Sequence, residues 1–224
     1  MKKYIAYLAV AAIAISCMPF LSSCRIVKAK KNVNMISSQL DLKDFNKIEM
    51  DGTFDLEFSL GPYAVTLIMP EEVGNNVVTN VTDSLLKIED TLRGSLNWQN
   101  RKIMLRVSAP DLSLLRINGA ADVDIKNIDI PELYIESNGA GDVDIEDSRI
   151  VRNTITLNGA GKVETEKLRG ETLTVNVNGS GKVDFNGEYQ HAYINLSGAS
   201  FADITELKCT DIHTTTSGAA KIEK

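Results

Sequence analysis

Acidic side chains recur at one position along the chain, and an array of this kind could bind a metal ion. The recurring acids are Glu57, Asp124, Asp144, Glu164, Asp184, Asp203 and Glu223. Two residues earlier the early copies carry a second acid and most later copies a lysine, so Asp122, Asp124, Asp142 and Asp144 have no lysine within the motif. Because Ca²⁺ prefers oxygen donors, these four aspartates are a candidate Ca²⁺ site. The simpler interpretation is a solvated face that resists edge-on pairing of sheets.

Paired carboxylates are also the catalytic groups of glycosidases, in which their separation sets the mechanism. A regular row of acids offers every such separation at each copy, and no copy is set apart by its neighbours. His191 and His213 could stack on adjacent turns, although chance placement in loops is the simpler interpretation. The sequence has no metal-ligand spacing, nucleophile elbow or phosphate loop. We therefore predict no catalytic residue and no cofactor apart from the Ca²⁺ considered above.

The acidic positions belong to a repeat of about twenty residues. Its copies begin at Asn118, Asn138, Asn158, Asn178, Ser197 and Ser217, each followed directly by glycine. The motif glycines are 20, 20, 20, 19 and 20 residues apart. An earlier copy occupies residues 48–58 around Gly52, and the motif is lost between Gly52 and Gly119. So constant a period predicts one structural unit used repeatedly.

Apolar and polar residues alternate within each copy, which is typical of strands with one buried face. In the second copy Leu133, Ile135, Val143 and Ile145 share one parity, with Gly139 and Gly141 between them at a tight corner. An antiparallel meander closing into a barrel would also place Asn-Gly pairs between alternating runs. We favour an all-β parallel solenoid, because corner size, inward apolar positions and outward acids all recur together.

The N-terminus has the features of a secretory signal, with Lys2 and Lys3 before an apolar stretch that is short for a membrane span. The stretch ends at Leu21-Ser-Ser-Cys24, which resembles the lipobox of bacterial lipoproteins and predicts lipidation of Cys24. We predict a signal peptide at residues 1–23, a lipidated and basic tether at 24–44, and a β-helix at 45–224. Within it, 45–112 would form irregular or capping coils and 113–224 the regular repeats.

Charge and cysteine usage constrain location and partners. The lipidated cysteine is followed by Arg25, Lys28, Lys30 and Lys31, which could lie on anionic headgroups. Some lipoproteins destined for the cell exterior carry acidic residues just after the lipidated cysteine. The basic residues at this position therefore favour the periplasmic face of an outer membrane over the cell surface. A net charge of −6 leaves no global basic surface for nucleic acid. Cys209 would be the one thiol left outside the signal and anchor, and we expect it to pack as a small apolar residue.

The Gly-containing motif, exemplified by Ile117-Asn118-Gly119, resembles that of the head GIN domain family of putative auto-transporter adhesins. The resemblance extends from about Asp44 to the C-terminus. It implies a single-stranded right-handed parallel β-helix in a bacterial cell envelope, which we predict to be Gram-negative. It implies no catalytic residues.

Aromatic side chains predicted to face outward are candidate platforms for sugar rings. They are Tyr134, Tyr189, Tyr193, Phe201 and Trp98, the last near Arg101. We therefore predict a non-enzymatic adhesion or ligand-binding module with a glycan or protein partner. The alternative is a carbohydrate-active enzyme of the pectin-lyase type. A third hypothesis is homo-oligomerisation through the C-terminal coil, which shows no capping pattern.

Overall fold

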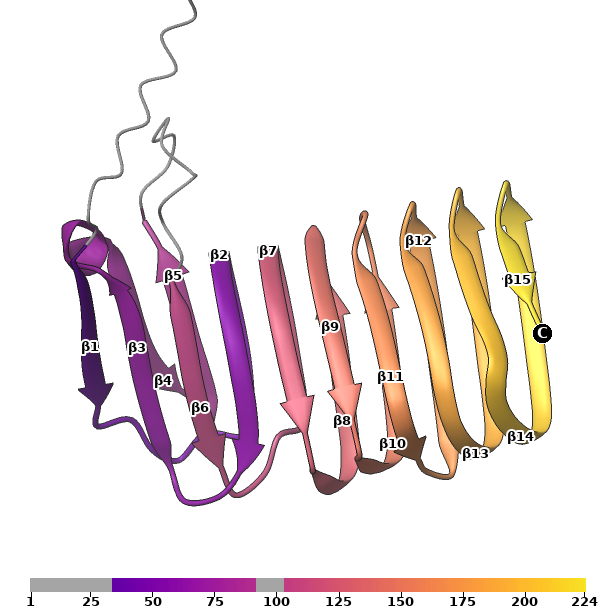
Figure 1. Cartoon of the computed structure of the whole chain (residues 1–224), viewed down its shortest axis with the longest axis horizontal. Coiled ribbons are helices and arrows are strands. Elements are labelled where there is room, and N and C mark those ends of the chain that lie inside the picture. Colours follow the sequence, from indigo (N-terminus) through magenta and orange to yellow (C-terminus); the bar gives the residue numbers. More distant parts are fainter. Residues whose placement is uncertain (1–33, 92–102) are drawn as a thin grey trace, which may run out of the picture. The chain divides into compact units, whose positions relative to one another are not determined.

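A computed structural model describes residues 34–91 and 103–224, which belong to one compact unit (Figure 1). The predicted signal, residues 24–33 of the tether including Cys24, and the residues Trp98 and Arg101 lie outside the described residues. The elements are β1 (Met35–Leu40), β2 (Lys47–Leu60), β3 (Ala64–Pro70), the 3₁₀-helix η1 (Glu71–Asn76), β4 (Val77–Thr82), β5 (Leu85–Asp90), β6 (Met104–Ala109), β7 (Leu114–Lys126), β8 (Asp129–Ser137), β9 (Ala140–Glu146), β10 (Arg149–Leu157), β11 (Lys162–Arg169), β12 (Thr172–Gly179), β13 (Lys182–Gly198), β14 (Phe201–Gly218) and β15 (Lys221–Glu223). None of the helices in this part of the chain has the length and apolar character needed to cross a membrane.

The repeats form a parallel β-solenoid of about six turns, as predicted. One layer contains β8, β10 and β12, and the other contains β9 and β11. The long strands β7, β13 and β14 turn a corner and contribute to both layers. Successive copies pair in parallel, 20 residues apart at Thr154 and Thr174. A meander would pair them antiparallel, so that alternative is wrong.

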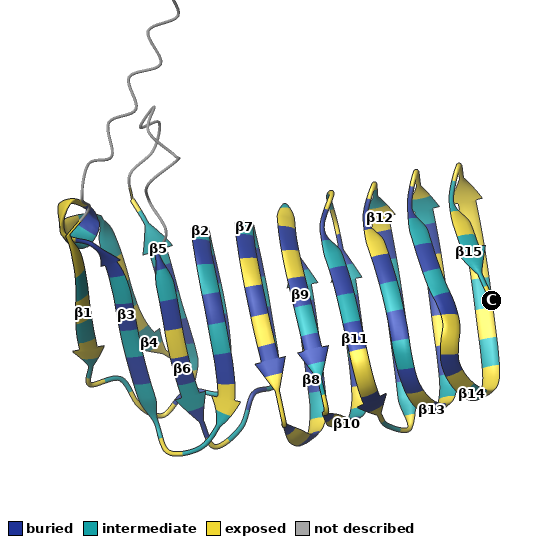
Figure 2. Ribbon diagram, viewed as in Figure 1, coloured by how far each residue is buried: buried dark blue, intermediate teal, exposed yellow. Residues whose placement is uncertain are grey.

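Apolar side chains from both layers fill the interior, and buried and exposed positions alternate along each strand (Figure 2). On β12, Leu173, Val175 and Val177 are completely buried, and on β9 Val143 and Ile145 are as well. This pattern is the direct result of the period-2 alternation in the sequence.

The motif glycine is required by the close approach of neighbouring coils. A Cβ added to Gly139 would fall well under 3.0 Å from the carbonyl oxygen of Gly119, and Gly119 has the same relation to Gly52. Gly119 also has a φ of 144°, which side chains rarely adopt. The corner was predicted to be tight on its inside; the structure shows that the restriction comes from the backbone of the adjacent coil.

The N-terminal strand β2 pairs regularly with its neighbours on both sides rather than forming an irregular coil. β2 pairs with β7 in parallel over twelve residues, with Gly52 beside Gly119, although 67 residues separate partners such as Asp51 and Asn118. The intervening strands β5 and β6 pair with the other edge of β2. Beyond them β3 and β4 run antiparallel and end the parallel stack, as a cap would.

The folded unit also begins earlier than residue 45. β1 lies within the predicted tether, yet it pairs antiparallel with β3 from Met35 opposite Pro70 to Leu40 opposite Val65. Its side chains alternate between exposed and half-buried. The predicted start of the β-helix at residue 45 is therefore too late in the sequence. The strand β1 covers the edge of β3 but carries no copy of the motif, so the repeat does not reveal it.

Replacing Gly139 by Ala is expected to lower the free energy of unfolding by about 2 kcal/mol, since the backbone of the preceding coil must move to admit the methyl group. Chemical denaturation would measure the change. Gly61→Ala is the matched control, because its added Cβ would meet atoms no closer than 3.7 Å. Equal effects of the two substitutions would contradict the proposed crowding.

Candidate functional site

The recurring acids form one column across the coils, as predicted. Pairing places Glu57 beside Asp124, then continues through Asp144, Glu164, Asp184, Asp203 and Glu223. The adjacent column runs through Asp55, Asp122, Asp142, Lys162, Lys182, Phe201 and Lys221. We call these two columns the acidic face.

Lysines offset part of the charge of the acidic face. Lys162 pairs with Glu164, and Lys182 lies 3.9 Å from Asp184. Lys182 and Lys221 each place their ammonium group 5.7 Å from the ring centroid of Phe201. Phe201 was expected to offer a free stacking platform, but cations from both neighbouring coils contact its ring.

The four aspartates of the candidate Ca²⁺ site are aligned, but they do not converge. Asp122 pairs with Asp142 and Asp124 with Asp144 along the strands. Across residues 34–91 and 103–224, no three acidic, histidine or cysteine side chains are arranged to hold a metal ion. Asp124 also lies 3.8 Å from the ammonium group of Lys126. The geometry offers no support for the Ca²⁺ hypothesis, which stays a prediction.

Asp144 is set apart from the other acids of the column by its electrostatics. Partial burial raises the pKa of its carboxyl group, and the neighbouring charges of Glu164 and Asp124 raise it further. A perturbed carboxyl group in a cleft would be a candidate for catalysis. A hollow of about 430 Å³ is lined by Glu57 and Asp124 of the acidic face, and two hollows of about 390 and 360 Å³ lie at the turns near Lys167 and Arg169. None of the three is lined by Asp144.

Part of the opposite layer presents uncharged polar side chains. They are Thr154 and Thr156 of β10, Thr172, Thr174 and Asn176 of β12, and Asn195 of β13. We call these six residues the hydroxyl face. The charged residues Glu132, Glu136 and Arg152 occupy neighbouring positions in the same columns. Tyr134, Thr154, Thr174 and Tyr193 occupy equivalent positions on four successive coils, so a tyrosine stands at each end of this column. The side chains of Tyr134 and Tyr193 are 46% and 42% exposed.

Each tyrosine at the ends of the hydroxyl face is held by a neighbour. The hydroxyl group of Tyr134 donates a hydrogen bond of 3.0 Å to Glu132. The ring of Tyr193 stacks on His213 of the next coil, with ring centroids 5.3 Å apart and an interplanar angle of 9°. His191 lies opposite Asp211, with Nδ1 and Oδ2 3.1 Å apart. The two histidines therefore contact other residues rather than each other.

Tyr189 is not a surface residue, and its assignment as a ligand platform is wrong. Its side chain is 5% exposed and its hydroxyl group donates to the carbonyl oxygen of Ile150 at 3.4 Å. Burial raises the pKa of this hydroxyl group strongly. The inward parity set by Phe185 continues through Tyr189, and only then shifts so that Ala192 and Ile194 face inward.

Cys209 packs against the core as expected, although it stays half-buried. Its sulfur lies 3.2 Å from the carbonyl oxygen of Asp211 and 3.4 Å from that of Gln190. Partial burial raises the pKa of its thiol.

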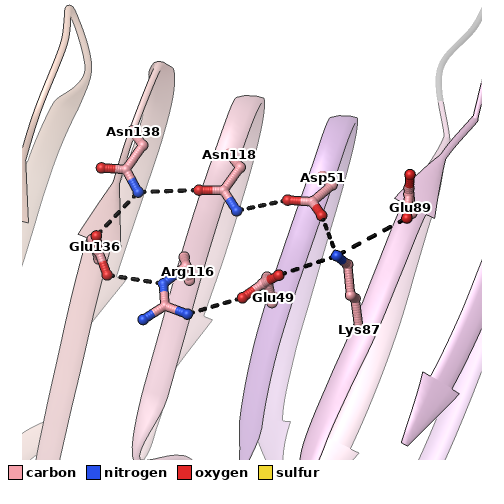
Figure 3. A network of polar contacts seen from close by, with 8 residues as sticks. All are labelled: Glu49, Asp51, Lys87, Glu89, Arg116, Asn118, Glu136 and Asn138. Atoms are coloured by element: carbon pink, nitrogen blue, oxygen red, sulfur yellow. Dashed lines mark hydrogen bonds and ion pairs between the residues drawn. The ribbon is translucent and has the colours of Figure 1, made fainter. Parts of the chain in front are cut away.

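Sequence reasoning missed a ladder of side-chain amides along the corner (Figure 3). The Nδ2 of Asn118 donates to Asp51 at 2.6 Å, and Asn138, Asn158 and Asn178 each donate to the preceding asparagine at 2.9–3.0 Å. The signal was present as the asparagine before four of the motif glycines. In the sequence alone, an Asn-Gly pair indicates only a tight turn.

Beside this ladder, an ionic network joins β2 to its neighbours on both sides (Figure 3). Arg116 lies 2.9 Å from Glu49 and 2.9 Å from Glu136, while Lys87 lies 2.7 Å from Asp51. The contact with Arg116 lowers the pKa of Glu136. No motif position marks these charges, so the network could be found only after β2 had been placed beside β7.

Comparison with known proteins gives a family and a fold. The model of the family described as "putative auto-transporter adhesin, head GIN domain" matches residues 44–223. A crystal structure of a putative lipid binding protein from Parabacteroides distasonis has a TM-score of 0.73 at 16% identity, covering 85% of this chain and 82% of that one. One of a putative adhesin from Bacteroides fragilis has a TM-score of 0.66 at 19% identity, covering 85% and 96%. No curated protein matches the sequence. At these identities the structural likeness shows the fold alone.

Replacing Asp144 by Asn is expected to raise the melting temperature at pH 7, by no more than about 2 °C because the group is partly exposed. Its raised folded-state pKa means that the ionised carboxyl group destabilises the fold above that pKa. The penalty is absent below the ordinary value of 3.8, so the gain should vanish as the pH falls to that value. Melting curves at several pH values would measure it.

Asp184→Asn is the control, because Asp184 has Lys182 as a partner and should give no gain. A gain of the same size in both variants, or one independent of pH, would contradict the assignment to Asp144. The same melts with added calcium or a chelator test the Ca²⁺ hypothesis. An unchanged melting temperature of the unmutated protein would remove that hypothesis.

Proposed function

Because the chain belongs to the head GIN domain family of putative auto-transporter adhesins, we propose that it is a lipid-anchored outer-membrane protein that binds a ligand on its surface without catalysis. The observation that carries the binding role is the surface built by the solenoid. Residues of one chemical type occupy equivalent positions on successive coils, as in the acidic and hydroxyl faces. Such a surface extends across several coils and suits an extended ligand, such as a glycan chain or a protein segment, better than a small molecule.

The lipid anchor is supported by the sequence at Leu21-Ser-Ser-Cys24 and by the charges that follow it. Arg25, Lys28, Lys30 and Lys31 would lie next to the acyl chains, where anionic headgroups attract them by about 1 kcal/mol each. The lipid and the basic tether would provide two membrane signals, which stable anchoring requires.

One observation favours the second candidate, a carbohydrate-active enzyme of the pectin-lyase type. Asp144 has a raised pKa and lies on the acidic face beside the column of Lys162. A general acid needs such a carboxyl group, but it also needs a cleft that positions substrate around it. None of the hollows described above is lined by Asp144, so we place binding first.

Cys24→Ala is expected to abolish incorporation of a clickable palmitate analogue and to release the protein from the membrane fraction, because the acylated thiol is lost. Metabolic labelling and fractionation of cells that make the full chain would measure both. Cys209→Ala is the matched control and should leave labelling unchanged. Labelling of the Cys24 variant would disprove the anchor, and protease treatment of intact cells would report which membrane face displays the protein.

Cells that display the full chain are expected to adhere to immobilised polysaccharide, mucin or matrix protein without releasing sugar products. Cells with an empty vector serve as the control, and sedimentation of purified protein reports any self-association. Release of reducing or unsaturated sugars would overturn the assignment in favour of the enzyme. Equal adherence of both cell types on every coated surface would overturn the binding role.

A further inference from the structure

The acidic face and the hydroxyl face differ in charge. The acidic face and its neighbouring positions carry carboxylates on every coil from β7 to β15. The six residues of the hydroxyl face carry no charge, although 24% of the chain consists of charged residues. A polyanion would be repelled by the first surface, and the cation beside the second, Arg152, already lies 3.5 Å from Glu132.

The threonine side chains of the hydroxyl face have hydrogen-bonding capacity to spare. Among the described residues, the hydroxyl groups of Thr154, Thr156, Thr172 and Thr174 form no side-chain hydrogen bond, and each can donate once and accept twice. Asn195 donates to Asn176 at 3.0 Å, which leaves the second amide hydrogen of Asn195 and both of those of Asn176. The surface therefore offers both donors and acceptors, as a sugar hydroxyl group requires.

The two exposed tyrosines frame this surface along the solenoid axis. Tyr134 and Tyr193 are three strand steps apart, or about 14 Å at the usual spacing of paired strands. The stack of Tyr193 on His213 fixes one ring, and the hydrogen bond of Tyr134 to Glu132 restrains the other. Rings held in this way lose little conformational entropy when a sugar ring packs on them.

The charges that border the hydroxyl face are already paired. Arg152 lies 3.5 Å from Glu132 on one side of Thr172, and His191 lies 3.1 Å from Asp211 on the other. None of the hollows described above is lined by the hydroxyl face, so a ligand there would lie across the strands rather than enter a pocket.

We propose that the hydroxyl face binds a neutral polysaccharide chain that runs along the solenoid axis, with sugar rings on Tyr134 and Tyr193 and sugar hydroxyl groups on the threonines between them. This inference rests on the proposed binding function and specifies its surface and ligand class. Charged polymers are disfavoured because the arginines beside the face are already paired with carboxylates, and none of the hollows described above lies on this face to receive the side chains of a protein segment.

Affinity electrophoresis of the mature chain from Arg25 onward, without lipid, tests the proposal against named polymers. The neutral probes are mannan, dextran, amylose, galactomannan and mixed-linkage β-glucan, and the anionic probes are alginate and polygalacturonate. Tyr134→Ala and Tyr193→Ala each remove a platform, and Thr174→Lys inserts a charge and a long side chain between them. Melting curves confirm that each variant is folded.

The matched controls lie on the acidic face. Phe201→Ala removes an aromatic ring there, and Asp142→Lys introduces a lysine at a column position where Lys162 and Lys182 already stand. We expect at least one neutral polymer to retard the unmutated chain and both controls equally. Each tyrosine variant should weaken that binding by about tenfold or more, and Thr174→Lys should abolish it.

Retardation by anionic polymers alone, by no polymer, or by a neutral polymer equally for Thr174→Lys and the unmutated chain would overturn the proposal. Adherence of cells carrying the full lipidated chain separates the two levels of inference. If Thr174→Lys cells adhere as well as unmutated cells, the binding function holds and the assigned face is wrong. If unmutated cells adhere no better than empty-vector cells, the binding function itself fails.

Discussion

Parallel hydrogen bonding between equivalent residues of successive coils is the constraint on which the rest of this structure depends. It fixes the register of β7 with β9 and of β8 with β10, so a side chain in one coil always has its counterpart in the next about 4.8 Å away. The motif glycine shows how closely the coils approach, since the carbonyl oxygen of Gly119 leaves no room for a Cβ at Gly139. Each side chain must therefore fit beside the side chain at the equivalent position of the adjacent coil.

Different side chains meet this demand in different ways. An asparagine amide both donates and accepts, so Asn118, Asn138 and Asn158 stack on one another through hydrogen bonds. A carboxylate only accepts, and a column of carboxylates needs cations beside it. Asp144 lacks such a partner on its own strand, and repulsion from Asp124 and Glu164 contributes to its raised pKa. Repulsion is also avoided where positive and negative side chains alternate from coil to coil, as where Arg116 lies between Glu49 and Glu136.

The same constraint decides what the sequence could predict. The twenty-residue period, the buried parity and the alignment of the acids follow from local pattern, and the structure confirms them. The position of β2 beside β7 does not follow, because 67 residues separate partners such as Asp51 and Asn118 and no local signal specifies that return. Tyr189 was misplaced because strand parity shifts within β13 after that residue. The two exposed tyrosines were identified singly, whereas their shared column depends on the 19-residue step between Thr174 and Tyr193.

Compatibility between coils also explains why an uncharged surface is the part of the solenoid available to a ligand. In the amide ladder and the ionic network, the polar side chains bond to the coil above or below. Threonine is tolerated in a column for another reason: its β-branched side chain packs well against neighbours on a pleated surface, so its hydroxyl group need not bond to the adjacent coil. The hydroxyl groups of Thr154 and Thr174 thus remain available. A polymer whose own groups repeat along the solenoid axis can then supply the hydrogen bonds that the coils do not make with each other.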